Sequence, residues 1–102
     1  MELAVIETLE ELGMSGFVQY NIQSFENRRW LIWLHNAYVP LSILEIEIYI
    51  NDHDETVGSV LQRDRIGRRT MFAIMNTLMR NIDDDDDSIE TLSISSQEVS
   101  VQ

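Results

Sequence analysis

Residues 43–50 read ILEIEIYI, and this stretch decides the fold. Glu45, Glu47 and Tyr49 alternate with four aliphatic residues, which are Leu44, Ile46, Ile48 and Ile50. Because successive side chains of a strand point to opposite faces of a sheet, the alternation predicts a strand with its aliphatic face in the core. The neighbouring strands are expected on either side of it in the sequence.

The preceding segment, WLIWLHNAYV at residues 30–39, is the most apolar run in the chain. As a strand it is apolar on both faces, with Trp30, Ile32 and Leu34 on one and Leu31 and Trp33 on the other. The segment also fits one face of a helix. We prefer a strand, because short runs rich in aromatic and β-branched residues favour strands, and Pro40 ends the element in either case.

The first 24 residues contain two further elements. Residues 17–24 alternate apolar and polar side chains and predict another half-buried strand, followed by a turn over residues 25–29. Residues 2–12 repeat apolar side chains at helical spacing, so we expect a helix that ends near Gly13.

Two helices are predicted after the central strand. A turn at residues 51–54 places Asp54 where it could cap a short helix over residues 55–62, although Gly58 weakens that helix. A longer helix is expected over residues 71–82, capped by Thr70. Its apolar stripe consists of Met71 or Phe72, Met75, Leu78, Met79 and Ile82.

The composition changes at residue 83, where five consecutive aspartates begin. Residues 1–82 carry eleven acids and seven arginines, a net charge of −4, whereas residues 83–102 carry seven acids and no base, a net charge of −7. We therefore expect a domain over residues 1–82 and an acidic, serine-rich, partly mobile segment over residues 83–102, in which residues 91–95 could pair as an edge strand.

The expected order is α-β-β-β-(α)-α-β, where the bracketed helix is residues 55–62. Strands joined by short turns indicate an antiparallel sheet of three to four strands with helices packed on one face, an α+β fold. This layout resembles that of small acidic secretion-chaperone-like domains, a resemblance that implies a fold and no residue roles. The short, acidic, motif-free profile is also similar to that of many orphan viral and accessory proteins.

The composition excludes several classes. The chain has 102 residues, a formal net charge of −11 and no cysteine, so disulfide, thiolate and cysteine–zinc chemistry are excluded. It also has no lysine, so every cation except histidine is an arginine. The longest apolar run is too short to span a bilayer, and the first residues lack the basic region of a signal peptide. We expect a soluble, intracellular protein.

No catalytic site is expected. The cluster from Asp52 to Glu55 contains carboxylates and one imidazole, but four consecutive residues cannot converge on one ion, so a turn is the preferred interpretation. His35 has no nucleophile partner in a recognisable arrangement, and no phosphate-binding glycine loop occurs. We predict a protein that is not an enzyme and holds neither a metal nor a cofactor.

The segment QRDRIGRR, residues 62–69, holds four of the seven arginines. The sequence allows three kinds of binding partner for this cluster. The aspartates at 83–87 could fold back on it, an acidic or phosphorylated partner could bind through arginine forks, or nucleic acid could bind. The acidic tail and high negative charge disfavour nucleic acid.

We therefore predict a non-catalytic protein–protein interaction module that binds a peptide or forms a homodimer. Tryptophan and arginine are enriched at binding hot spots. The predicted contact residues are Trp30, Trp33, Arg63, Arg65, Arg68 and Arg69. The alternative is a nucleic-acid-associated regulatory protein that uses the same arginines.

Overall fold

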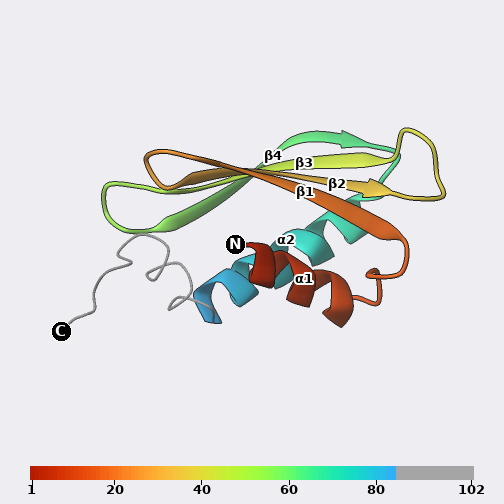
Figure 1. Cartoon of the computed structure of the whole chain (residues 1–102), viewed down its shortest axis with the longest axis horizontal. Helices are drawn as coiled ribbons and strands as arrows, with labels where there is room; N and C mark the ends of the chain where they lie inside the picture. The colour runs from red at the N-terminus through yellow and green to blue at the C-terminus, as the bar shows by residue number, and fades with distance from the viewer. Residues whose placement is uncertain (85–102) are drawn as a thin grey trace.

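The computed structural model describes residues 1–84 and confirms the predicted α+β class (Figure 1). The elements follow the order α-β-β-β-β-α. Their bounds are α1 Glu2–Glu11, β1 Val18–Phe25, β2 Arg29–Asn36, β3 Ile43–Ile50, β4 Thr56–Asp64 and α2 Arg68–Asp84. A fourth strand stands where the short helix was expected.

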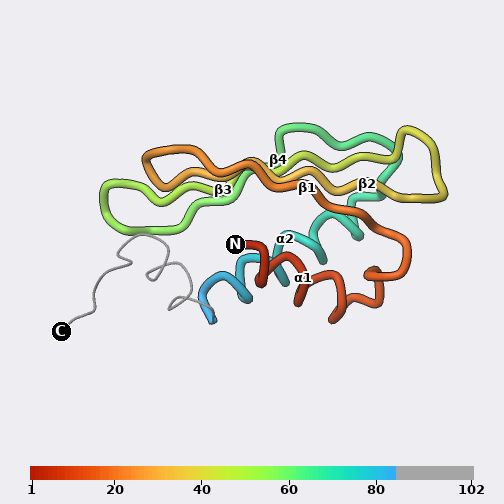
Figure 2. The backbone as a smooth tube through the Cα atoms, viewed as in Figure 1, coloured from red at the N-terminus to blue at the C-terminus, as the bar shows by residue number. Residues whose placement is uncertain are grey.

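The four strands form one antiparallel sheet in the order β1-β2-β3-β4, with each strand beside its neighbour in sequence. Both helices lie on the same face of this sheet (Figures 1 and 2), which leaves the other face without a covering layer among the described residues. The turns β1–β2 and β3–β4 lie at one end of the sheet, and the β2–β3 loop lies at the other.

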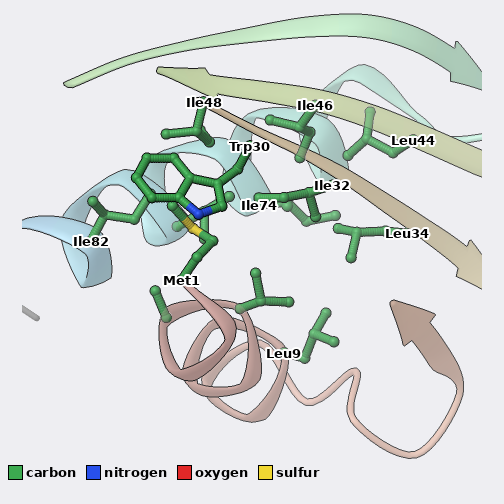
Figure 3. Packing of buried hydrophobic residues seen from close by; sticks show 13 residues of the cluster. Met1, Leu9, Trp30, Ile32, Leu34, Leu44, Ile46, Ile48, Ile74 and Ile82 are labelled. Atoms are coloured by element: carbon green, nitrogen blue, oxygen red, sulfur yellow. The ribbon is translucent and has the colours of Figure 1, made fainter. Parts of the chain in front are cut away.

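The core lies between the sheet and the helices and is built mainly on β2 and β3. The register pairs Trp30 with Ile48 and Ile32 with Ile46, and alternate residues of both strands are buried. The Trp30 indole lies between the sheet and the helices (Figure 3). The strand interpretation of the segment 30–39 is thereby confirmed for residues 30–36, and the strand ends at Asn36, before Pro40 is reached. The inward face of the central strand is confirmed as well.

The helix expected over residues 55–62 is wrong, because these residues belong to β4. Thr56, Val57 and Val60 are β-branched and fit a strand beside β3. Gly58 pairs with Ile48, and a Cβ at this glycine would lie 2.9 Å from the sulfur of Met79 on α2. The glycine therefore lets α2 pack closely on β4, and it does not interrupt a helix.

The ends of the last helix also differ from the prediction. It begins at Arg68 rather than at residue 71, so Thr70 lies inside the first turn and is not its cap. It continues through Asp83 and Asp84, the first two of the five aspartates. Met71, Met75 and Met79 pack against the core, which agrees with the predicted apolar stripe.

Within residues 1–84, no helix is both long and apolar enough to cross a membrane. The predicted edge strand at residues 91–95 and the rest of the predicted acidic segment from residue 85 onward lie outside the described residues.

Candidate protein-binding surface

The four clustered arginines lie at the corner where the chain passes from β4 to α2. Arg63 is near the end of β4, Arg65 follows it in the left-handed region with φ of 57°, and Arg68 and Arg69 open α2. Only residues 65–67 separate the strand from the helix, so the cluster occupies one end of the molecule, the end that also holds the β2–β3 loop (Figure 1).

The three arginines outside this cluster each form an ion pair. Arg28 binds Asp54 at 2.8 Å between nitrogen and oxygen, and Arg29 binds Glu47 at 2.5 Å. Arg80 binds Glu11 and links α2 to α1. These arginines are therefore already neutralised by carboxylates of the folded domain.

The clustered arginines have no such partner in the part of the chain that the structure describes. Arg63 donates a hydrogen bond to the carbonyl oxygen of Ile66 at 2.7 Å, but no carboxylate of residues 1–84 forms an ion pair with any of the four. All four are exposed. Asp64, which accepts a hydrogen bond from Gln62, is the one acidic residue within residues 62–69, so this end of the described domain carries an excess of positive charge that no ion pair neutralises.

Helix stability does not explain these charges. The amino end of a helix is the positive end of its dipole, and a cation there costs about 0.3–1 kcal/mol where an anion would be favourable. Arg68 and Arg69 lie at this end of α2, and Asp83 and Asp84 lie at the negative carboxyl end. Both ends of α2 therefore carry the charge that the dipole disfavours.

Exposed apolar side chains lie beside the arginines on the β2–β3 loop. Tyr38 is 77% exposed and Leu41 is 74% exposed, and Val39 between them is also exposed. Leu41 has φ of 63°, a left-handed conformation that is uncommon for leucine. A shallow groove between this loop and β4 is lined by Val39, Leu41 and Arg65 among others. We call the four arginines with Tyr38, Val39 and Leu41 the arginine end.

Side-chain hydrogen bonds hold this apolar loop in place. The Oδ1 atom of Asn36 accepts the backbone N–H groups of Tyr38 at 2.8 Å and Val39 at 3.0 Å. The apolar side chains of the loop are thus presented on an ordered backbone. The sequence analysis missed them, although apolar residues flanking Pro40 in a loop are a visible signal for an exposed contact.

The two tryptophans predicted as contact residues lie apart. Trp30 is buried in the core at 8% exposure. Trp33 is partly buried on the open face of the sheet, where it pairs in register with Asn21 of β1 and Glu45 of β3. The structure thus brings the four arginines together, but it places neither tryptophan among the residues of the arginine end.

The acidic turn at residues 51–55 is held together by its own hydrogen bonds. In the turn after β3, Asn51 Oδ1 accepts the N–H groups of His53 and Glu55, both at 2.9 Å, while Asp54 is engaged by Arg28. Among residues 1–84, no group of three or more histidine or acidic side chains could hold a metal ion. The predicted turn is therefore present, whereas the helix cap expected at Asp54 is not, because the strand β4 follows the turn.

Asp83 and Asp84 cannot reach the clustered arginines of their own chain. They end α2, whereas Arg68 begins it, and sixteen steps of 1.5 Å separate Arg68 from Asp84 by about 24 Å. Of the three partners left open for the cluster, the return of the aspartate run therefore does not hold for these two aspartates. The remaining aspartates of the run lie outside the described residues.

Comparisons with known proteins give no relative from which a role could be transferred. No protein-family model matches the chain, and neither a search of curated proteins nor a search of solved structures found a match. We therefore infer the function from the arrangement of the residues themselves.

Proposed function

We propose that this protein is a non-catalytic interaction module whose arginine end binds an acidic segment of another protein. The observation that carries this proposal is the contrast among the seven arginines: the three outside the cluster bind carboxylates, and the four inside it have none within residues 1–84. Guanidinium groups form two-pronged hydrogen bonds with carboxylates and phosphates, so an acidic or phosphorylated peptide supplies the missing partners.

The apolar loop favours a protein over a nucleic acid as the partner. Tyr38 and Leu41 are large and largely exposed, and aromatic residues beside arginines are enriched at protein interfaces. Nucleic-acid affinity depends on neutralising many phosphates. A chain of net charge −11 repels the phosphates, and four arginines offset this repulsion only in part. The absence of cysteine agrees with a place of action inside the cell.

The test is a nuclear magnetic resonance titration of the full chain with an oligoglutamate peptide that contains leucines. We expect shifts of the backbone amides at residues 38–41 and 63–69. Arg63→Gln with Arg65→Gln should weaken binding at least about tenfold, since each charged hydrogen bond contributes about 1.5–3 kcal/mol. Arg28→Gln with Arg29→Gln removes the same charge at ion-paired arginines that lie outside both the cluster and α2. This variant should leave affinity within about twofold, because screened surface charges have only a small long-range effect.

Two results would overturn the proposal. One is equal loss of affinity in both double variants, which would mean that the peptide senses only total charge. The other is a single-stranded oligonucleotide that binds the same amides more tightly than the peptide and loses affinity steeply with salt, which would favour the nucleic-acid alternative.

A further inference from the structure

The face of α2 that points away from the core forms an exposed stripe. It is opposite to the buried residues Ile74, Leu78 and Ile82. At 100° per residue, side chains spaced by three, four, four and three positions share one helix face. The stripe consists of Arg69, Phe72, Asn76, Arg80 and Asp83, all of them exposed.

The stripe has opposite charges at its two ends and an apolar residue inside. Arg69 is at the amino end, Asp83 is at the carboxyl end, and Phe72 between them is 53% exposed. Asn76 lies midway, seven residues from each charged end. When a second copy of the stripe is turned end to end, its charges are complementary to those of the first copy. Such self-complementarity is the requirement for an interface with two-fold symmetry.

We propose that two copies of this chain associate through antiparallel α2 helices that cross at Asn76. In this arrangement Arg69 faces Asp83 of the partner subunit, and Phe72 faces Arg80 of the partner subunit. Each contact occurs twice. The proposal deepens the proposed function, on which it rests, by naming a second copy of the chain as an acidic partner of Arg68 and Arg69.

The pairing accounts for the reversed charges of α2. In a lone α2, the positive dipole end carries Arg68 and Arg69 and the negative end carries Asp83 and Asp84. An antiparallel neighbour places its Asp83 and Asp84 beside the arginines and beside the positive dipole end. The charges that are unfavourable within one helix thus become favourable between two.

The interface is expected to be small. Contact along one helix buries less than the roughly 800 Å² per partner of a standard stable interface. The dimer should therefore form in a concentration-dependent equilibrium with the monomer, and sedimentation velocity over a wide concentration range should show association that stops at two copies.

Charge exchange tests the register. Arg68→Asp with Arg69→Asp makes both ends of α2 acidic, and Asp83→Arg with Asp84→Arg replaces the two acidic residues of its last turn by basic ones. Each variant alone should dimerise at least tenfold more weakly than the wild type. An equimolar mixture should form a heterodimer, because each acidic end then meets a basic one. As a matched control, Glu10→Arg with Glu45→Arg changes the net charge by the same amount as Asp83→Arg with Asp84→Arg, but at positions outside the stripe. This control should not produce the pattern of weakened self-association and restored heterodimer formation.

A cysteine at the crossing point tests the geometry independently, because the chain has no other cysteine. Asn76→Cys should form a covalent dimer under mild oxidation, since the two copies meet at this position. Gln23→Cys on the open sheet face serves as the control and should cross-link much less.

The results separate this inference from the proposed function. A wild-type chain that stays monomeric at all concentrations, or equal cross-linking of both cysteine variants, overturns the α2 pairing. If the oligoglutamate peptide still shifts residues 63–69 of that monomer, the proposed function stands. If the peptide does not shift these residues, both the α2 pairing and the proposed function are wrong.

Discussion

Trp30 and Trp33 lie three residues apart on β2 and on opposite faces of the sheet. Trp30 packs between the sheet and the two helices (Figure 3). Trp33 belongs to the opposite face of the sheet, which no described element covers. The two tryptophans therefore have different roles, which the apolar character of the segment does not distinguish. Trp30 stabilises the core, and Trp33 contributes to an outer surface.

Replacing each tryptophan by alanine should show this difference. We expect Trp30→Ala to lower the free energy of unfolding by about 3–5 kcal/mol, because it leaves a cavity in the core. Trp33→Ala should lower it by roughly 1–2 kcal/mol, because part of that side chain is already in contact with water. Denaturant unfolding monitored by circular dichroism measures both, and equal losses would contradict the assignment of faces.

A buried polar link between the helices gives a second prediction. The side-chain amide of Asn81 donates a hydrogen bond to the Thr8 hydroxyl at 3.0 Å, and that hydroxyl donates to the carbonyl oxygen of Ala4 at 2.7 Å. Thr8→Val should cost about 1–3 kcal/mol, because it leaves the Asn81 amide without its acceptor. In a double-mutant cycle with Asn81→Leu, the two losses should not add. Additive losses would show that the link is not an energetic unit.

Tyr20 gives a prediction about pH. The hydrogen bond from its hydroxyl to Glu2 at 2.7 Å, followed by slight desolvation and the charge of Glu2, raises the pKa of Tyr20 above its ordinary value of 10.0. The neutral tyrosine is thus favoured in the folded state, so its contribution to stability is present below pH 10 and is lost as the pH rises through the raised pKa. Glu2→Gln should lower the pKa of Tyr20 toward 10.0, as measured from its ring carbon resonance. An unchanged pKa would show that the carboxylate is not the cause.

The glycine of β4 gives a fourth prediction. A side chain at Gly58 would meet Met79 and Met75 of α2. Gly58→Val should therefore cost about 1–3 kcal/mol through overpacking, despite the higher strand propensity of valine. In a Met79→Ala background the same substitution should cost less, because space has been opened. An equal cost in both backgrounds would place the strain elsewhere.

The sequence allowed much of the fold to be predicted, and the reason is visible in particular residues. The strict alternation of residues 43–50 has no helical equivalent, so the central strand was assigned correctly. Before β4, by contrast, Asp54 in the acidic turn resembles a helix cap, which led to the wrong helix prediction. Gly58 in β4 is explained only by the packing of α2 methionines on that glycine. Such a close approach between distant segments is not encoded in local periodicity.

The candidate site was predicted only in part. Four arginines within seven residues are visible in any reading of the chain, and they do lie together. Their lack of ion pairs within residues 1–84, and the loop with Tyr38 and Leu41 beside them, depend on which distant segments meet at that end. Those relationships required the three-dimensional structure.

The central claim is that the clustered arginines serve binding and do not stabilise the domain. The most direct test is the free energy of unfolding of the full chain with Arg68→Gln and Arg69→Gln, compared with Arg80→Gln, at a concentration at which every variant is monomeric, so that lost dimerisation does not contribute. We predict that the first variant is as stable as the wild type or up to about 1 kcal/mol more stable, because unfavourable charges leave the helix start, whereas Arg80→Gln loses a few tenths. A loss of more than about 1 kcal/mol in the first variant would show that these arginines already have partners within the chain, and it would contradict the account.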